Sequence, residues 1–319
     1  MKNYLLTLLL TLGTLNADLV EMFRTQGIQS VQQYLEKQLT KKEYWAKYLE
    51  NKDVSQGYYE TIQYVLVCQK DTSNLKVYHN DTTQFKKLFD HNVLVGENQG
   101  DKKIEGDKKT PTGAYDLTKK LKNLDPFYGP LAMVTSYPNL YDKIQKKNGH
   151  GIWIHGVPQN DKRDNYTKGC IALENSDIKA LDTKINLDKS ILIISDKYID
   201  KISKKDISIV LGEIFSWKET WKQSQIKKYL SFYSNKFKRN NGMDIKQFKR
   251  YKTTIFSRKE KKKIVFSNIN IMPYPNSQNK KMFRVVMDED YRTANYQFKG
   301  KKELFIELLD NKMKILTES

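Results

Sequence analysis

The sequence has few of the residues that build disulfide frameworks and metal sites. Its 319 residues include two cysteines and four histidines, so a disulfide-rich scaffold is excluded. No cysteine pair and no His-x-x-x-His spacing supports a zinc site, and His150 and His155 would face opposite sides of one regular strand. We therefore expect neither a metal ion nor a cofactor.

Long apolar runs are scarce as well. Outside residues 4–12, no stretch approaches the ~20 apolar residues that a membrane-spanning helix needs. Residues 4–12 follow Lys2 and precede small residues that end at Ala17, a pattern typical of a secretory signal peptide. An uncleaved anchor and a buried N-terminal helix are the alternatives. We predict a signal peptide at residues 1–17 and a periplasmic mature protein.

Acidic residues are outnumbered by basic ones. The chain has 56 Lys and Arg against 37 Asp and Glu, a formal net charge of +19. Such an excess favours an anionic partner such as nucleic acid, an anionic membrane or peptidoglycan. The lysines are spread along the whole chain, as in any protein from a lysine-rich genome. Export argues against nucleic acid as the partner.

Two segments, 18–60 and 61–196, lie between the predicted signal peptide and the C-terminal part of the chain. Residues 18–60 carry apolar side chains at three- and four-residue steps, which predicts helices with one apolar face. That face should pack on the next domain, on a second copy of the chain as a homodimer, or on both. Residues 61–196 predict a mostly β domain, with one short helix at 175–181 capped by Asn175 or Ser176. Its strands are expected at 61–68, 75–78, 92–95, 114–117, 131–136, 151–155 and 190–194.

Residues 205–319 predict a helix followed by an antiparallel sheet, so the whole chain is expected to be α+β. The helical pattern covers 207–237, and a final hairpin should turn at Asp310 and Asn311. Trp217, Trp221 and Tyr233 have helical spacing, which is more typical of a core than of a ligand pocket. Further strands are expected at 253–256, 263–271, 282–287 and 291–298.

A histidine and a cysteine form the candidate catalytic pair. His155 ends the apolar segment 152–155, and Cys170 follows Gly169 after a polar spacer that is long enough to loop back. A thiol attacks as its thiolate, and an imidazole is the usual acceptor of its proton. Gly169 allows close backbone approach, so amides around Lys168, Gly169 and Cys170 would face a developing oxyanion. We predict Cys170 as the nucleophile and His155 as the general base.

Neighbouring residues have weaker signals. The planar fork of Arg163 suits a substrate carboxylate, and a solvated loop charge is an equal alternative. Trp153 is a candidate substrate contact, although a core position is favoured, and the Thr167 hydroxyl is expected to bond within its own turn. A disulfide between Cys68 and Cys170 is the alternative for the cysteines. Cys68 ends an apolar strand, however, which indicates a small buried hydrophobe.

These motifs resemble the signature of the L,D-transpeptidase catalytic domain family, in which His-Gly is followed by a spacer and Ser/Thr-x-Gly-Cys. The matching positions are His155, Gly156, Thr167, Gly169 and Cys170. The turn at 110–113 and the segment 129–139 also resemble parts of the family, so the resemblance covers roughly residues 61–196. It implies catalytic roles for Cys170 and His155 and a Gly156 carbonyl that orients the imidazole.

The whole layout resembles a subgroup of L,D-carboxypeptidases that trim muropeptides in helical Gram-negative bacteria and end in an NTF2-like domain. The implied function is removal of the terminal D-Ala from tetrapeptide stems of peptidoglycan, which affects the cell wall and cell shape. The family usually has an arginine two residues after the cysteine, where this chain has Ala172. Arg163 or a lysine such as Lys168 would replace it. The alternatives are an L,D-transpeptidase, which forms cross-links or attaches proteins to peptidoglycan, and a non-enzymatic wall-binding scaffold.

Overall fold

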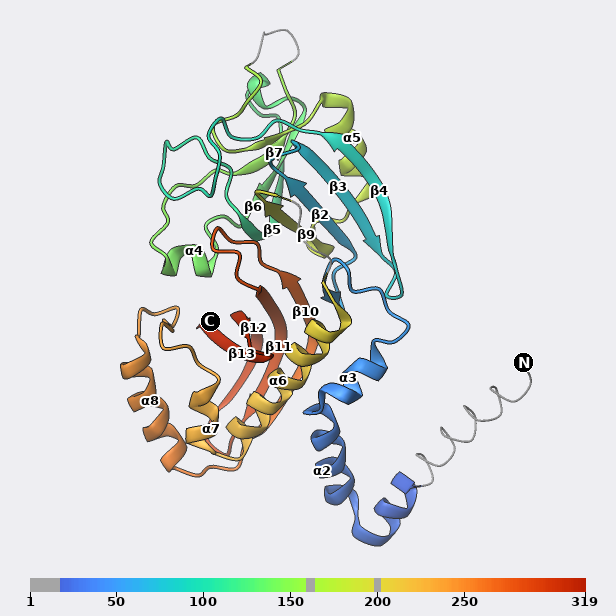
Figure 1. The fold of residues 1–319 in the computed structure, drawn as a ribbon, viewed down its shortest axis with the longest axis vertical. Helices are drawn as coiled ribbons and strands as arrows, with labels where there is room; N and C mark the ends of the chain where they lie inside the picture. Colours follow the sequence, from blue (N-terminus) through green and yellow to red (C-terminus); the bar gives the residue numbers. More distant parts are fainter. Residues whose placement is uncertain (1–17, 159–163, 198–201) are drawn as a thin grey trace, which may run out of the picture.

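A computed structural model describes residues 18–158, 164–197 and 202–319 of the protein (Figure 1). The predicted signal peptide and Arg163 lie outside these residues. Figure 1 shows one sheet in the upper half of the molecule and a second sheet in the lower half, together with helices α6, α7 and α8. Helices α2 and α3 lie beside α6. The α+β class predicted from the sequence is confirmed.

The first sheet has eight strands in the order β4-β3-β2-β9-β5-β6-β7-β8. Its pairs are antiparallel except β2 with β9 and β7 with β8. One face packs on helix α5, which provides buried Ile178 and Leu181. The bounds are β2 Tyr64–Gln69, β3 Asn74–Asn80, β4 Phe85–Asn92, β5 Gly113–Lys122, β6 Leu131–Thr135, β7 Trp153–His155, β8 Ile171–Ala172, β9 Ser190–Ser195, α4 Leu140–Ile144 and α5 Asn175–Lys184.

Two expectations for this domain are wrong. Strand β4 covers Phe85–Asn92, whereas the sequence predicted a strand at 92–95. It is an edge strand whose side chains are mostly solvent-exposed, so it lacks the apolar alternation that reveals a buried strand. The N-cap of α5 is Glu174, and the Asn175 side chain bonds the backbone of Val157 instead.

The second sheet has the order β1-β10-β11-β12-β13, with every pair antiparallel. Trp217, Trp221 and Tyr233 are buried in the core that the helices and this sheet share, which confirms the core interpretation. The hairpin at Asp310 and Asn311 is also confirmed, since both residues have positive φ. The bounds are β1 Tyr58–Tyr59, β10 Lys263–Pro273, β11 Met282–Arg292, β12 Gln297–Leu309, β13 Lys312–Glu318, α6 Lys204–Lys222, α7 Ile226–Ser231 and α8 Ile245–Ser257.

Three expectations for this domain need correction. The predicted strand 253–256 is the end of α8, which begins at a capping box formed by Asp244 and Gln247. The predicted helix 207–237 divides into α6 and α7, because Ser224 has a φ of 53° and ends the first helix. The run 291–298 divides between β11 and β12 around a turn closed by Thr293 and Tyr296.

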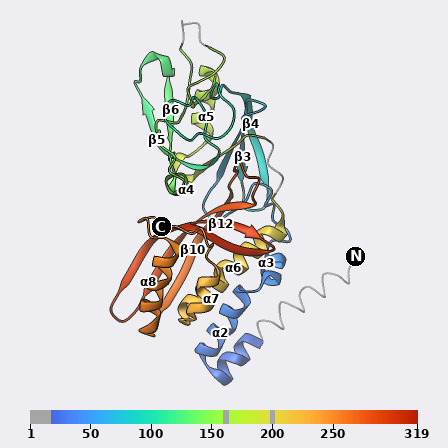
Figure 2. The ribbon, with the colours of Figure 1, turned by 60° about the vertical axis from the view of Figure 1, so that its left-hand side comes forward.

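The N-terminal segment packs on the C-terminal domain (Figures 1 and 2). Helices α2 (Ile28–Leu39) and α3 (Lys42–Tyr48) contact α6, and Trp45 stacks on Phe215 with ring centroids 5.4 Å apart. The predicted helical region ends early, because Tyr58–Tyr59 forms strand β1 at the edge of the second sheet. Exposed apolar side chains remain on this segment, and the homodimer stays a prediction.

Buried polar contacts join the two sheets. Arg284 on β11 is 5% exposed and donates to both Asp116 oxygens on β5, at 2.9 and 2.6 Å. It also donates to Glu303 on β12 at 2.6 Å. Asn139, which precedes α4, donates to the buried Tyr274 hydroxyl at 3.1 Å. These contacts hold the eight-stranded sheet against the C-terminal domain.

Replacing Lys252 by methionine is expected to raise the melting temperature at pH 7 by a few degrees. Burial lowers the pKa of the Lys252 ammonium to about 8, and its Nζ lies over the rings of Trp221 and Tyr229 at 5.0 and 5.4 Å. In the unfolded chain Lys252 keeps its proton up to the ordinary pKa of 10.5, so the buried charge costs on the order of 3 kcal/mol below pH 8.

That cost disappears as the pH rises from about 8 to 10.5, because the folded protein then carries neutral Lys252. The stabilisation by methionine should therefore shrink across this interval in thermal unfolding at several pH values. Lys249→Met on the exposed face of the same helix is the control and should change little. A lower melting temperature for Lys252→Met at pH 7 would contradict the prediction.

Candidate active site

The pairing of two short strands brings His155 and Cys170 together. Strand β7 ends at His155, and β8 begins directly after Cys170. The strands are parallel, with His155 opposite Ala172, and the amide of Leu173 donates to the His155 carbonyl at 2.9 Å. Since side chains alternate along a strand, His155, Ala172 and Cys170 share one face of the sheet. Both predicted catalytic residues line one cleft of about 900 Å³.

The imidazole of His155 has a defined orientation. The ring is 1% exposed, and its Nδ1 lies 2.6 Å from the Gly156 carbonyl oxygen, as the resemblance implied. A carbonyl oxygen only accepts, so Nδ1 carries the proton in the neutral ring and Nε2 carries the lone pair. The edge of the Tyr128 ring packs against the imidazole at 5.1 Å and 84°. The arrangement therefore presents a base at Nε2.

The backbone after His155 is held by close packing. A Cβ on Gly156 would collide with the Oδ1 of Asn175 and with Pro130, so only glycine fits here. The Asn175 side chain accepts from the Val157 amide at 3.0 Å and donates to the Val157 carbonyl at 2.8 Å. Asn175 thus holds the backbone that follows β7, next to the Gly156 carbonyl that orients the imidazole. The sequence suggested only a helix cap for this residue, since its partners lie on a distant segment.

The turn before Cys170 is organised by Thr167. Its hydroxyl donates to the Cys170 carbonyl at 2.7 Å and accepts from the Gly169 amide at 3.0 Å, as expected for bonding within the turn. Gly169 has a φ of 132°, which favours glycine. Because the Gly169 amide points into the turn, the oxyanion role predicted for it is not supported. The Cys170 thiol donates to the Gly151 carbonyl at 3.3 Å.

The two cysteines have different environments and form no disulfide. Cys170 is partly exposed, and Cys68 is completely buried. The disulfide alternative is therefore wrong. Burial raises the pKa of the Cys68 thiol to about 12, so this thiol is inert at neutral pH. Cys170, by contrast, reaches the solvent through the cleft.

The cleft is lined by residues from several loops. Lys168 lines it and is exposed, so it is a cation available to a substrate carboxylate. Trp153 is not among the cleft-lining residues that the structure describes, and its ring packs on Tyr128 at 5.1 Å, so a substrate contact is not supported. Residues that the sequence did not single out also line the cleft: Lys102, Glu105, Phe127 and Tyr128. His150, considered from the sequence only as a metal ligand, lines it as well.

The loop between β4 and β5 provides one wall of the cleft through Lys102. A buried ion cluster anchors this loop, with Lys147 Nζ 2.6 Å from Asp101 and 2.9 Å from Asp142. The Tyr274 hydroxyl of the C-terminal domain donates to Asp142 at 3.4 Å. The cleft wall is therefore tied to the neighbouring domain.

The described residues contain neither a metal-binding cluster nor a membrane-spanning helix. Within residues 18–158, 164–197 and 202–319, no three His, Cys, Asp or Glu side chains are grouped to hold a metal ion. In the same residues no helix combines the length and the apolar character needed to cross a bilayer.

Comparison with known proteins agrees with this site and fold. Residues 63–193 match the L,D-transpeptidase catalytic domain, and residues 209–319 match the Cds6 C-terminal NTF2-like domain. The helical cell shape determining protein Pgp2 of Campylobacter jejuni is 42% identical, with a TM-score of 0.83 over 88% of this chain and 99% of that chain. A mutant form of Pgp2 matches at 41% identity, with a TM-score of 0.85 and the same coverage.

The chain belongs to the L,D-transpeptidase catalytic domain family. Members of this family are cysteine-based peptidoglycan enzymes, and this member carries an NTF2-like domain at its C-terminus. Bd1075 of Bdellovibrio bacteriovorus is a more distant match, with 27% identity and a TM-score of 0.68 over 84% of this chain and 96% of that chain. No curated protein matches the chain.

Proposed function

We propose that the protein is a periplasmic L,D-carboxypeptidase that removes the terminal D-Ala from tetrapeptide stems of peptidoglycan. One observation carries the proposal: the His155 imidazole, with Nδ1 held by the Gly156 carbonyl, shares a cleft with the thiol of Cys170, which forms no disulfide. The similarity to a cell shape determining protein supports a role in cell-wall structure and cell shape. Export by residues 1–17 and a homodimer through 18–60 belong to the same proposal.

The reaction has two steps. His155 Nε2 takes the Cys170 thiol proton, and the thiolate attacks the carbonyl that joins diaminopimelate to D-Ala. The C–N bond then breaks, His155 returns the proton to the leaving amine, and a thioester remains. In the second step His155 takes a proton from water, hydroxide attacks the thioester, and the thiol is restored as the tripeptide leaves.

The position of Ala172 supports water as the final acceptor. This residue is 1% exposed and stands opposite His155 on the neighbouring strand, where the family usually has an arginine. Among the residues that the structure describes, the face beside the catalytic pair then presents no guanidinium fork for the carboxylate of a second stem. Hydrolysis then needs only a water molecule in the cleft.

Digestion of purified disaccharide tetrapeptide tests the proposal. The wild-type protein is expected to release free D-Ala and give disaccharide tripeptide, measured by mass spectrometry. Cross-linked dimers as the main product would show an L,D-transpeptidase instead. Recovery of unchanged tetrapeptide would overturn the enzymatic proposal in favour of a wall-binding scaffold.

Lys168→Ala is expected to raise the KM for disaccharide tetrapeptide by roughly three- to tenfold and to leave kcat within about twofold. Lys168 is exposed at the cleft, two residues before Cys170, where its ammonium can bind a stem carboxylate before reaction. Lys168→Arg keeps the charge and should retain most of the affinity. An unchanged KM in Lys168→Ala would show that another group binds the carboxylate.

A further inference from the structure

A tyrosine of the C-terminal domain bonds residues of the eight-stranded domain. Tyr274 directly follows strand β10 and is 3% exposed. Its hydroxyl accepts from the Asn139 side chain at 3.1 Å and donates to Asp142 at 3.4 Å. The approach is close, since a Cβ on Gly113 would lie 2.9 Å from the hydroxyl oxygen. Figure 1 shows α4, which Asn139 caps, at the boundary between the two sheets. The Tyr274 hydroxyl therefore bonds across the domain boundary.

The cluster that Tyr274 joins has two carboxylates for one ammonium. Lys147 Nζ lies 2.6 Å from Asp101 and 2.9 Å from Asp142, and the three side chains are 9% exposed or less. Tyr274 and Lys147 contact the same oxygen of Asp142. A buried carboxylate without enough donors is costly, so a neutral donor stabilises the cluster. Burial raises the pKa of the Tyr274 hydroxyl, which therefore keeps its proton and donates.

This cluster holds the loop between β4 and β5 at Asp101. One Asp101 oxygen contacts Lys147, and the other accepts from the Thr112 amide at 2.9 Å. Asp101 thus ties the middle of the loop to its end. Without the Tyr274 hydroxyl, Asp142 would attract Lys147 more strongly, because Lys147 would be its remaining side-chain donor. The contact between Lys147 and Asp101 that holds the loop would then weaken.

The same loop contacts the turn that carries the nucleophile. At the start of the loop, Gly96 and Thr167 form a parallel bridge. Toward its end, the Lys109 carbonyl packs so closely on Gly169 that a Cβ there would approach the oxygen to 2.8 Å. Cys170 follows Gly169 directly. Both ends of the loop therefore contact the turn before Cys170, and a displaced loop would move the thiol relative to its base.

We propose that Tyr274 is a positioning residue for the reaction: through Asp142 and the loop between β4 and β5, it keeps the Cys170 thiol aligned with His155. The C-terminal domain is then part of the working catalytic unit, although none of its residues touches the reacting atoms. This inference rests on the proposed function, because the alignment serves the attack of the thiolate on the stem peptide. Small displacements of reacting groups reduce rates strongly.

Tyr274→Phe in the full chain tests the inference, since it removes the hydroxyl and keeps the ring. With disaccharide tetrapeptide, kcat is expected to fall by roughly three- to tenfold while KM stays within about twofold of the wild-type value. The reason is that the thiol loses its alignment while the groups that bind the stem remain. An unchanged kcat, or a loss confined to KM, would overturn the positioning role.

Alkylation of Cys170 by iodoacetamide measures the alignment without any peptide. The rate constant of Tyr274→Phe at pH 7 is expected to be roughly three- to tenfold below that of the wild type, because the thiolate forms only with His155 in reach. Cys68 is completely buried, so the intact mass should show one adduct. An unchanged rate would overturn the inference. A reduced rate in a protein whose wild type cleaves no tetrapeptide would overturn the proposed function and leave the alignment standing.

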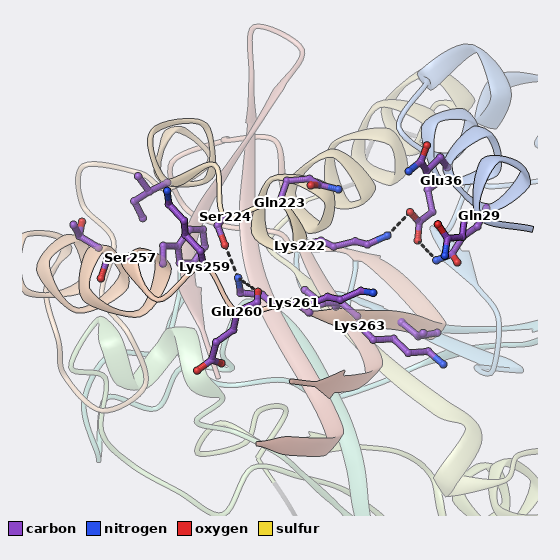
Figure 3. A pocket seen from close by; sticks show the side chains of 18 residues that line it. Gln29, Glu36, Lys222, Gln223, Ser224, Ser257, Lys259, Glu260, Lys261 and Lys263 are labelled. Atoms are coloured by element: carbon purple, nitrogen blue, oxygen red, sulfur yellow. Dashed lines mark hydrogen bonds and ion pairs between the residues drawn. The ribbon is translucent and has the colours of Figure 1, made fainter. Parts of the chain in front are cut away.

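Two controls separate positioning from stability. Tyr59→Phe removes a hydroxyl from a tyrosine of the same core, which donates to the Gln56 carbonyl at 2.6 Å. Ser224→Ala removes a hydroxyl that accepts from buried Lys262 at 2.6 Å. It lines a hollow between α2, the α6–α7 turn and the α8–β10 connection (Figure 3), at the opposite end of the molecule from β7. Both variants should be less stable than the wild type, yet keep kcat and the alkylation rate within about twofold. Kinetic losses equal to that of Tyr274→Phe would overturn the inference.

Asp101→Asn tests the path through the loop, and it also serves if Tyr274→Phe does not fold. The amide keeps an acceptor for the Thr112 amide and removes the charge that faces Lys147. Its alkylation rate should fall in the same direction as that of Tyr274→Phe. In the double variant the combined loss should be smaller than the product of the single losses, because both changes act on one loop. Losses that multiply, or an unchanged rate in Asp101→Asn, would overturn the role of the loop.

Discussion

Cys170→Ala is expected to lower kcat/KM for disaccharide tetrapeptide by more than about 10⁴-fold, with the fold and the melting temperature preserved. The alanine leaves the Thr167 hydroxyl bonds intact, because these involve the backbone of Cys170 and Gly169. Without the sulfur no thioester forms, and water in the cleft has no activated nucleophile to replace it. The measurement is D-Ala release in steady state, with circular dichroism to check folding.

His155→Gln provides the companion measurement and is expected to reduce the rate by about 10²- to 10⁴-fold, the range for loss of a general base. Raising the pH should restore part of this loss, because solvent then deprotonates the Cys170 thiol directly. Cys68→Ala is the matched cysteine control. Cys68 is buried on β2 and its thiol has a pKa of about 12, so activity should remain close to that of the wild type. Equal losses in the Cys68 and Cys170 variants would exclude a nucleophilic role specific to Cys170.

Arg284→Met is expected to lower the free energy of unfolding by about 2–4 kcal/mol. The guanidinium is buried between the domains, and its removal leaves the carboxylates of Asp116 and Glu303 without their cation. Burial alone would lower the pKa of Arg284, but the neighbouring Asp116 and Glu303 carboxylates raise it, so the group stays charged. The side chain of Asp116 is 47% exposed, and its partial hydration keeps the loss below the upper limit for a buried pair.

Chemical denaturation of Arg284→Met measures this loss, and Arg292→Met is the control on the same strand. Arg292 also pairs with an aspartate, Asp290 at 2.7 Å, but it is solvent-exposed and should contribute nothing measurable. The catalytic parameters of Arg284→Met should stay close to wild type below its unfolding transition, because the site residues lie on β7 and β8. Equal stability of the two variants would show that the interdomain contact is not a major source of stability.

The sequence predicted the catalytic pair because its signal is local. Gly156, after His155, is needed for close packing, and Gly169, before Cys170, is needed for a positive φ. Each glycine is next to the residue it serves, so the sequence shows both directly. The strands with alternating or continuous apolar residues, such as β2 and β9, were predicted for the same reason. Edge strand β4 was missed because its exposed side chains carry little periodic signal. The end of helix α8 was taken for a strand because residues 253–256 are β-branched or aromatic, types that are enriched in strands.

Residues whose roles depend on distant partners could not be predicted. Asn175 lies eighteen positions beyond Val157 in the chain, and only the packing of α5 against the exit of β7 reveals that it positions the site.

The sequence alone determined the fold class and predicted the nucleophile and its base, because glycine spacing and apolar periodicity act within a few residues along the chain. The tertiary structure decided that Asn175 holds the backbone after His155, that the Gly169 amide is already bonded in the turn and that the loop through Lys102 forms one wall of the cleft. These properties depend on distances between segments, and only the packed fold sets those distances.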